Sequence, residues 1–472
     1  MVTTIKKPFI ISIFGASGNL AAIKIYPTLY ELMEKGLLPS SFAVIGYARS
    51  SMTNQEFRAF VTKSIRQNYK KKINNKVLNS LLKKTHYIAG NYNNLDDFKH
   101  YRKQLGTMLK KKKLTNICYF AVPPIVFKDI IKNLALSRKS ENEDIRLVLE
   151  KPFGDNASSA RDLFHFVSRY FEEENIYLLD HYLGKSVVQS ILSLRESNRI
   201  LNLIMRGPEV ANIQITAFET VGVENRIGYF EKVGTLKDMI QSHLLQVLSL
   251  ITMSIPVTNI DTSLHREKNS ILSAIKFSRS KKNIVLGQYK GYTDNEGVKK
   301  NSRTDTFAAL RLFIDRQSWY KVPIYIRTGK RLHEHHTYIV IELKKHAFQP
   351  ASEPPNRIVL EFFPDERINI KLVNRHGHTL QYQDITTSDT IACEDDSCLP
   401  EHGVLIRDVI AGRKRFFLSF PEVIATWELI DSIIKFSHRN NVPIESYAPG
   451  SYGPQSQNKI TRMDGFEWYD IH

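Results

Sequence analysis

Cysteine is scarce in this chain: only Cys118, Cys393 and Cys398 occur among its 472 residues. Cys118 lies in an apolar run, and no second pair accompanies the other two. The count argues against a disulfide scaffold or a four-cysteine zinc site and fits a reducing compartment. We therefore expect no bound metal.

Long apolar runs are also missing. No stretch approaches the roughly 18 uninterrupted apolar residues that a membrane span needs. Lys6 and Lys7 precede the short apolar stretch Phe9–Phe14, as in a signal peptide, but no small-residue cleavage site follows. We expect a soluble protein that stays in the cytoplasm and has no membrane partner.

Acidic residues are few relative to basic ones. The 48 Asp and Glu residues against 66 Lys and Arg residues give a net charge of +18, part of it in lysine clusters at 70–72, 110–113 and 281–282. Solvated helices and loops explain such clusters best, although a positive field also attracts phosphorylated metabolites. No zinc-finger, recognition-helix or stacking-aromatic pattern accompanies them, so we expect no nucleic-acid partner.

Apolar strands alternate with helical patterns in the first part of the chain. Strands are expected at 9–15, 42–47, 116–122, 145–149 and 176–179, and helices at 18–35, 53–69 with an extension at 77–82, 125–136 and 157–173. Such alternation is typical of a parallel, doubly wound sheet. Residues 1–180 are therefore predicted to form a Rossmann-like domain.

The pattern changes after about residue 185. Helical patterns cover 186–198 and 236–254, and strand-like runs occur at 211–219, 307–313, 322–327, 337–343, 358–363 and 368–372. Many strands with few helices predict an α+β domain with a mainly antiparallel sheet. The fold class is thus α/β, with a larger α+β domain at residues 181–472.

The sequence Gly15-Ala16-Ser17-Gly18 lies where the first expected strand passes into the first helix. Glycine permits a sharp turn there, and the N–H groups of the helix N-terminus could bind a phosphate. The spacing departs from Gly-x-Gly-x-x-Gly. A tight turn without a ligand is an equal alternative on this stretch alone.

The end of the second expected strand bears on the choice between NAD and NADP. An NAD site usually has an acidic residue there for the ribose hydroxyls, whereas this chain has Arg49 followed by Ser50. The donors of a guanidinium suit the oxygens of a 2′-phosphate. The pattern favours NADP over NAD; the alternative is that Arg49 is an ordinary surface charge.

Two short segments concentrate reactive side chains. Asp180-His181-Tyr182-Leu183-Gly184-Lys185 places an acid, an imidazole, a phenol and an amine after a strand, a combination that could bind a phosphate. The helical segment 236–254 carries Asp238 and His243, which an α-helix places about 140° apart around its axis. His243 is a candidate base; taken alone, a histidine in such a leucine-rich helix is more often a core residue.

A series of motifs then runs through nearly the whole chain: GASGNLAAIKIYPTL, GYARS, YFAVPP, EKPFG, DHYLGK, GVENRIGYF, KDMIQSHLLQ, VLGQYKGY, TFAALRLFID, VPIYIRTGK and GSYGP. In this order they resemble the glucose-6-phosphate dehydrogenase family, and the pair EKPFG and DHYLGK is highly specific. The resemblance implies NADP-dependent oxidation of glucose 6-phosphate at C1 to 6-phosphogluconolactone, the first oxidative step of the pentose phosphate pathway. It also implies a homodimer or homotetramer, with an NADP-binding domain at residues 1–180 and a substrate-binding and oligomerisation domain at 181–472.

The resemblance assigns a role to each site residue. His243 would remove the proton of the C1 hydroxyl, and Asp180 would stabilise the resulting imidazolium. Pro152 would follow a cis peptide at the junction of cofactor and sugar. The NADP site would comprise Gly15, Ala16, Ser17, Gly18, Asn19, Leu20, Arg49, Tyr119 and Lys151; the 6-phosphate site His181, Tyr182 and Lys185; and the contacts to sugar hydroxyls Lys151, Glu219, Asp238 and Lys330.

Several positions depart from the family pattern. Asn19 stands where the family has Asp, Leu178 where it has Arg, Phe363 where it has a sugar-binding Gln and His335 where it has another basic residue, while EHGVLI at 401–406 replaces AYERLL. The lysine- and arginine-rich determinants of a second, structural NADP site are not evident near the C-terminus. The alternative to the standard activity is therefore a divergent homologue with an altered sugar-phosphate preference, or a non-catalytic NADP-binding paralogue.

Overall fold

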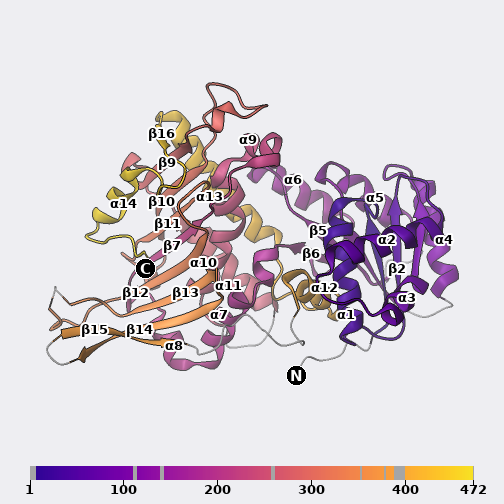
Figure 1. Ribbon diagram of the computed structural model, residues 1–472, viewed down its shortest axis with the longest axis horizontal. Coiled ribbons are helices and arrows are strands. Elements are labelled where there is room, and N and C mark those ends of the chain that lie inside the picture. The colour runs from indigo at the N-terminus through magenta and orange to yellow at the C-terminus, as the bar shows by residue number, and fades with distance from the viewer. Residues whose placement is uncertain are drawn as a thin grey trace. The chain divides into compact units, whose positions relative to one another are not determined.

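The computed structural model describes residues 7–109, 114–138, 143–256, 261–350, 353–376, 379–386 and 399–470. The chain divides into two compact units, Met1–Lys185 with Asp395–Phe420 and Ser186–Glu394 with Pro421–His472 (Figure 1). The first division thus falls after Lys185, not after Asp180. The sequence pattern did not predict that Asp395–Phe420 returns to the first unit. Cys118 is buried, and Cys393 and Cys398 lie outside the described residues.

The first unit contains a six-stranded sheet with the order β3-β2-β1-β4-β5-β6, in which all neighbouring strands are parallel. This order reverses between β1 and β4, which is the point where Rossmann sheets bind dinucleotides. The doubly wound fold expected from the sequence is confirmed. The strands are β1 (Phe9–Phe14), β2 (Phe42–Ala48), β3 (Thr85–Ala89), β4 (Thr115–Phe120), β5 (Ile145–Glu150) and β6 (Ile176–Leu179).

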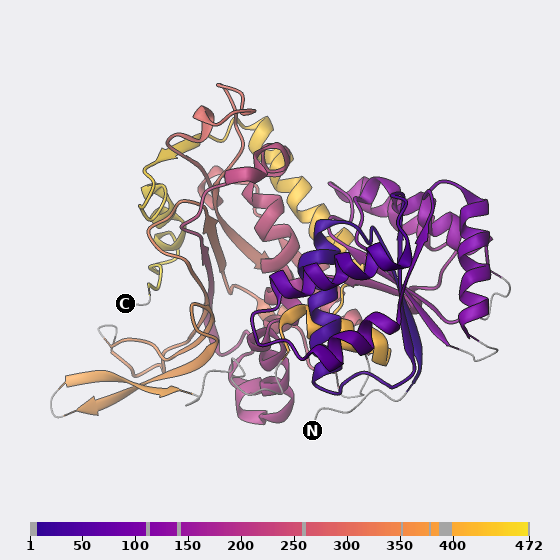
Figure 2. The ribbon, with the colours of Figure 1, turned by 45° about the vertical axis from the view of Figure 1, so that its right-hand side comes forward.

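Helices cover both faces of this sheet (Figure 2). They are the π-helix η1 (Ala21–Ile25), α1 (Tyr26–Glu34), α2 (Asn54–Asn68), α3 (Asn75–Lys83), α4 (Leu95–Leu109), α5 (Phe127–Leu136), α6 (Ala157–Val167) and α12 (Glu401–Ala411). On one face α1 packs on α2, α3 and α12, and on the other α5 packs on α4 and α6. Apolar side chains of α12 belong to the core of this unit, so the return segment is integral to it.

Before α12, three helices of this unit differ from the expectation, and one of them, α4, lies where no helix was expected. α3 is a separate helix rather than an extension of α2, because Asn74 begins it by accepting the N–H groups of Lys76 and Val77. α6 ends at Val167 instead of reaching residue 173, since the N–H groups of Tyr170 and Phe171 both donate to the Val167 carbonyl and close its last turn.

The second unit contains a larger sheet with the order β15-β14-β13-β12-β7-β11-β10-β9-β16, and β8 pairs with β10. Only two of these pairs, β7 with β11 and β9 with β16, are parallel, so the expected mainly antiparallel sheet is confirmed. The strands are β7 (Val210–Phe218), β8 (Ile275–Lys276), β9 (Ile284–Tyr289), β10 (Phe307–Ile314), β11 (Ile324–Gly329), β12 (His336–Leu343), β13 (Arg357–Phe363), β14 (Arg367–His376), β15 (Thr379–Thr386) and β16 (Ile444–Tyr447).

Helices of the second unit pack on this sheet, with α7 against β13 and the π-helix η6 against β11. They are α7 (Ser186–Ser197), α8 (Arg199–Ile204), α9 (Ile227–Thr235), η6 (Leu236–Leu244), α10 (Leu245–Thr252), α11 (Asp261–Ala274), α13 (Phe420–Arg439) and α14 (Asn458–Arg462). Among the helices of the described residues, none combines the length and the apolar character that crossing a membrane requires.

A buried charge cluster joins α11 to α13. The Glu422 carboxylate, which is fully buried, lies 2.7 Å from the ammonium of Lys268 and 2.7 Å from Nδ1 of His265. Burial alone would raise the pKa of Glu422, but the charges of Lys268 and His265 lower it to about 2. The cluster therefore contributes to the stability of this unit only while Glu422 is ionised.

Replacing this carboxylate should destabilise the protein. Glu422→Gln leaves the buried Lys268 ammonium without an anion, so we expect a loss of about 3–5 kcal/mol in the free energy of unfolding. In the wild type this contribution is complete above pH 4.5 and is lost as the pH falls towards 2. Urea denaturation of the full wild-type and variant chains at a series of pH values measures both the loss of stability and its pH dependence. An unchanged midpoint, or an equal loss in the exposed control Glu428→Gln, would contradict the role of the cluster.

Candidate active site

At the glycine turn after β1, the backbone lies very close to the end of β2 and to the residues that follow β4. Gly15 has φ of 88°, and a Cβ there would lie only 2.3 Å from the Ala121 carbonyl oxygen. The N–H groups of Gly15 and Ala16 both donate to the Tyr47 carbonyl, at 2.9 and 3.3 Å. Helical structure starts at Asn19, directly after Gly18, and the first N–H groups of a helix have no acceptor within it. The turn therefore fits a phosphate of a dinucleotide.

Arg49 lies beside this turn. It follows β2, and the β1–β2 register places Tyr47 opposite Phe14, the last residue before the turn. Arg49 is exposed, and its Cζ lies 6.0 Å from the ring centroid of Tyr92, a cation–π arrangement. Tyr92 is a neighbour that sequence reasoning missed, because no local pattern links it to the end of β2.

Tyr119 occupies a different setting. It lies in β4, is 1% exposed, and its hydroxyl donates to Oε1 of Glu150 at 2.5 Å. Burial, together with the carboxylate of Glu150, raises the pKa of Tyr119, and burial raises the pKa of Glu150 to about 7. The hydroxyl is thus engaged with the end of β5, and a contact between Tyr119 and NADP stays a prediction.

The motifs EKPFG and DHYLGK meet because β5 and β6 are parallel neighbours, with Glu150 opposite Leu179. The residues that follow these two strands form an ion pair, Lys151 Nζ to Asp180 Oδ2 at 2.8 Å. Asp180 is fully buried, and its Oδ1 accepts the N–H of Tyr182 at 3.0 Å. The Lys151–Pro152 peptide is cis, as the resemblance implied.

The expected phosphate-binding residues lie on the short 3-10 helix His181–Gly184 and just after it. The rings of His181 and Tyr182 are 5.2 Å apart, and the Lys185 ammonium lies 5.0 Å from the Tyr182 ring centroid. Gly184 has no room for a side chain, because a Cβ would lie 2.7 Å from the Glu401 carbonyl oxygen at the start of α12. α12 therefore fixes the position of this helix.

In the second unit three expected sugar-binding residues come together. β7 and β11 are parallel with Phe218 opposite Gly329, so the residues that follow, Glu219 and Lys330, are adjacent. The Lys330 ammonium pairs with the Glu219 carboxylate and lies 3.8 Å from Oδ2 of Asp238. Lys330 is only 6% exposed. The three form a compact cluster of one buried cation and two carboxylates.

Asp238 and the candidate base His243 lie on η6, which is a π-helix rather than the expected α-helix. The N–H of Leu245 at its end donates to the carbonyl of Ile240, the i→i+5 spacing of a π-helix. Residues five apart therefore lie about one turn apart, and the 140° separation expected for an α-helix is wrong. His243 is 7% exposed.

Two residues that depart from the family pattern contact each other. The rings of His335 and Phe363 stack with centroids 3.8 Å apart and an interplanar angle of 22°. The β7–β12 register pairs His336 with Phe218, which puts His335 at the level of Glu219. The stacked pair thus lies at the same end of the sheet as the Glu219–Lys330 ion pair. Leu178, by contrast, is buried in β6 at 1% exposure.

Comparison with known proteins accounts for these features together. Family models described as "Glucose-6-phosphate dehydrogenase, NAD binding domain" and "Glucose-6-phosphate dehydrogenase, C-terminal domain" match residues 12–190 and 192–469. This chain belongs to the glucose-6-phosphate dehydrogenase family. A family relative from Arabidopsis thaliana, "Glucose-6-phosphate 1-dehydrogenase 1, chloroplastic", is 32% identical over 98% of this chain and 84% of its own length.

Other members of the family cover the chain equally well. "Glucose-6-phosphate 1-dehydrogenase" of Dickeya dadantii is 31% identical over 97% of both chains. A solved structure described as "Glucose-6-phosphate dehydrogenase in complex with its substrate glucose-6-phosphate" superposes with a TM-score of 0.90 at 29% identity, covering all of both chains. The family assignment therefore applies to both units.

Proposed function

We propose that this chain oxidises glucose 6-phosphate at C1 to 6-phosphogluconolactone, with NADP as the electron acceptor. The observation that carries the proposal is the Lys151–Asp180 ion pair, which joins the two most specific motifs of the family at the ends of β5 and β6. The family's relatives are named for this activity. The primary test is NADPH formation from glucose 6-phosphate, followed by absorbance; no turnover would overturn the proposal.

The cofactor would be held by the first unit. The turn at Gly15–Gly18 and the helix start behind it would bind the pyrophosphate, and Arg49 with Ser50 would bind the 2′-phosphate. When bound, NADP supplies a nicotinamide ring that accepts a hydride. The residue after β2 is the basic Arg49 and not an acid, so the position that usually excludes a 2′-phosphate carries no carboxylate.

The substrate would be held through both of its ends. His181, Tyr182 and Lys185 supply donors for the 6-phosphate. Glu219, Asp238 and Lys330 supply acceptors and a donor for sugar hydroxyls, and their mutual ion pairs fix those side chains before the sugar arrives. Such preorganisation lowers the cost of ordering the site on binding.

The proton would be handled by His243. Its imidazole takes the proton of the C1 hydroxyl, the C1–O bond becomes a carbonyl, and the hydrogen on C1 leaves with its electron pair. Asp180 would hold the imidazole and stabilise its charged form, the role of the acid in other acid–histidine pairs. The products are the lactone, reduced cofactor and one proton.

Assembly and location are further parts of the proposal. The family resemblance supports a homodimer or homotetramer. Light scattering of the protein during size-exclusion chromatography gives the molar mass that distinguishes the two. The low cysteine content supports a reducing compartment such as the cytoplasm.

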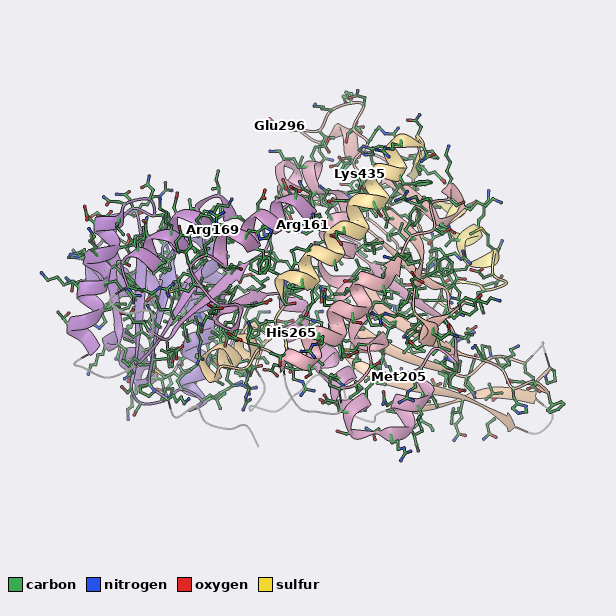
Figure 3. All side chains as sticks on the ribbon, turned by 180° about the vertical axis from the view of Figure 1, so that it is seen from behind. Arg161, Arg169, Met205, His265, Glu296 and Lys435 are labelled. Atoms are coloured by element: carbon green, nitrogen blue, oxygen red, sulfur yellow. The ribbon has the colours of Figure 1, made fainter. Side chains whose placement is uncertain are left out.

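Removing the arginine after β2 should affect one cofactor far more than the other. Arg49→Ala should raise KM for NADP by an amount equivalent to about 1.5–3 kcal/mol, because a charge-assisted contact is lost, and should change KM for NAD little. Steady-state kinetics with both cofactors measure this, with Arg169→Ala (Figure 3) as an exposed control in the same unit. Equal effects on NADP and NAD would remove Arg49 from this role.

Removing the base should slow turnover without weakening sugar binding. His243→Asn should lower kcat by about 10²–10⁴ and leave KM for glucose 6-phosphate within a small factor, and Asp180→Asn should act in the same direction. The exposed control His100→Asn should behave as wild type. Near-normal kcat in a folded His243→Asn protein would show that another group takes the proton.

The stacked pair should alter sugar selectivity. Phe363 can neither donate to nor accept from a hydroxyl, so a buried hydroxyl facing it loses about 1–3 kcal/mol. We expect a high KM for glucose 6-phosphate, negligible activity on glucose, and tolerance of epimers such as galactose 6-phosphate. Phe363→Gln should lower KM for glucose 6-phosphate and sharpen the preference.

The measurement is kcat/KM for both sugar phosphates. Phe348→Gln serves as a matched control, because Phe348 is 90% exposed in the same unit. A wild type that is already as selective as Phe363→Gln would show that Phe363 does not face the sugar.

A further inference from the structure

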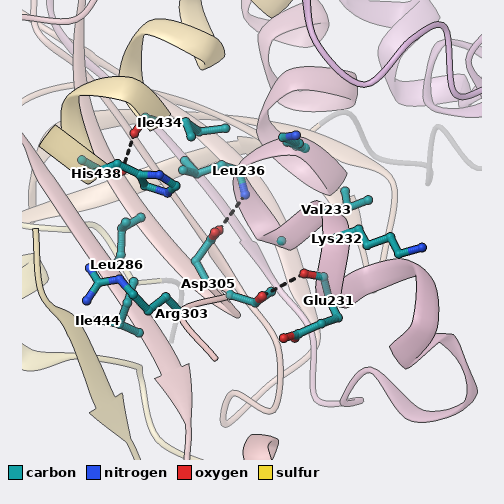
Figure 4. Close-up of a pocket in the computed structure, with 14 residues that line it drawn as sticks. Glu231, Lys232, Val233, Leu236, Leu286, Arg303, Asp305, Ile434, His438 and Ile444 are labelled. Carbon is teal, nitrogen blue, oxygen red and sulfur yellow. Dashed lines mark hydrogen bonds between the residues drawn. The ribbon is translucent and has the colours of Figure 1, made fainter. Parts of the chain in front are cut away.

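The second unit contains a cavity of about 280 Å³ that none of the predicted site residues lines. It lies between the end of α9, the start of η6, the loop before β10 and the last turns of α13 (Figure 4). Its volume is just below the roughly 300–1,000 Å³ of ordinary ligand pockets. A small molecule fits this space, whereas a dinucleotide does not.

The lining has an apolar part and a basic part. Leu236, Leu286, Ile434 and Ile444 supply apolar surface. The basic residues are Lys232, Lys237, Arg303 and His438. Figure 4 shows the side chains of Arg303 and His438 on the same side of the cavity, next to Leu286. A concave apolar surface with a few convergent polar groups is the usual form of a small-molecule site.

The two acidic residues of the lining are occupied within the fold. Glu231 accepts the hydroxyl of Tyr292 at 2.7 Å, and Oδ2 of Asp305 accepts the N–H of Leu236 at 2.8 Å. Burial raises the pKa of Asp305 to about 7, so its negative charge is only partly present near neutral pH. Lys232, Lys237 and Arg303 together outnumber the two carboxylates, so the net charge of the lining is positive.

We propose that this cavity binds a small organic carboxylate, with its carboxylate at Arg303 and His438 and its apolar body against Leu236, Leu286 and Ile434. Arg303 is exposed and donates to the Val442 carbonyl through one terminal nitrogen at 2.8 Å, which orients the guanidinium. The planar fork of donors on a guanidinium matches the geometry of a carboxylate. The apolar side chains of the lining favour an anion that has a hydrocarbon body over a fully polar one.

A ligand in this cavity would contact the start of the helix that carries Asp238 and His243. Leu236 and Lys237 are the first residues of η6, and Asp305 holds the N–H of Leu236. The next residue, Thr306, accepts the N–H of Lys330 through its carbonyl at 2.9 Å. We therefore expect a ligand bound in this cavity to change kcat for glucose 6-phosphate oxidation. This coupling rests on the proposed function, whereas the binding of the ligand does not.

Calorimetric titration of the full chain with three probes tests the site. Hexanoate carries both the charge and the hydrocarbon body, 1-hexanol only the body and acetate only the charge. We expect one hexanoate per chain and at least tenfold weaker binding of the other two. Arg303→Gln and His438→Gln should each weaken hexanoate binding at least tenfold, and the exposed Lys435→Gln on α13 (Figure 3) should not.

Each of the following results would overturn one specific part of the proposal. Failure of hexanoate to bind, or equal binding of 1-hexanol or acetate, overturns the ligand class. Unchanged affinity in Arg303→Gln, or equal loss in Lys435→Gln, overturns the location, provided that thermal melting shows all variants folded. Hexanoate that binds without changing kcat overturns the coupling alone. A chain without glucose 6-phosphate oxidation overturns the proposed function and leaves the titration readable.

Discussion

The buried charge of Asp180 is the constraint on which the first unit's part of the site depends. A carboxylate with no exposed surface is costly unless it is paired and hydrogen-bonded. Lys151 supplies the pairing and the N–H of Tyr182 supplies the hydrogen bond. Because these partners come from the ends of β5 and β6, one carboxylate fixes both motifs. The 3-10 helix His181–Gly184, which carries residues proposed to bind the phosphate, begins at that same carboxylate.

The second unit contains a buried cation, which likewise needs partners of opposite charge. Lys330 is held between Glu219 and Asp238, and its position follows from the parallel pairing of β7 with β11. Asp238 reaches this cation from η6, whose π spacing also sets His243 one turn away. A long π-helix is rare, and π segments occur often at functional sites. The helix type is thus part of how Asp238 and His243 are positioned.

Local patterns predicted the elements whose apolar residues are continuous or periodic. The strands β1, β2, β4, β5 and β6 and most helices of the first unit follow from such patterns. β3 did not, because its sequence Thr85–Ala89 mixes His and Tyr with few aliphatic residues. The return of α12 to the first unit depends on packing against α1, and the sequence near residue 400 contains no signal for it.

The same limit applies to the site residues, whose neighbours in space a local pattern does not predict. The motifs identified the charged groups, and the resemblance supplied their roles. The sequence could not reveal the π-helix, since the residues between Asp238 and His243 suit an α-helix as well. Nor could it reveal that His335 and Phe363 touch, because His335 directly precedes β12, Phe363 ends β13, and only the register of these two strands brings the residues together.

That contact changes how the departures from the family pattern should be interpreted. Two separate substitutions in a sugar site would each leave a polar group or a gap to be compensated. A stacked pair instead satisfies both positions at once, because each ring buries a face of the other. The pair keeps this end of the sheet packed, and the phenyl ring of Phe363 offers no hydrogen-bonding group there. If a sugar binds at this end as proposed, its polar contacts would come from Glu219, Lys330 and Asp238, whose geometry their own ion pairs already fix.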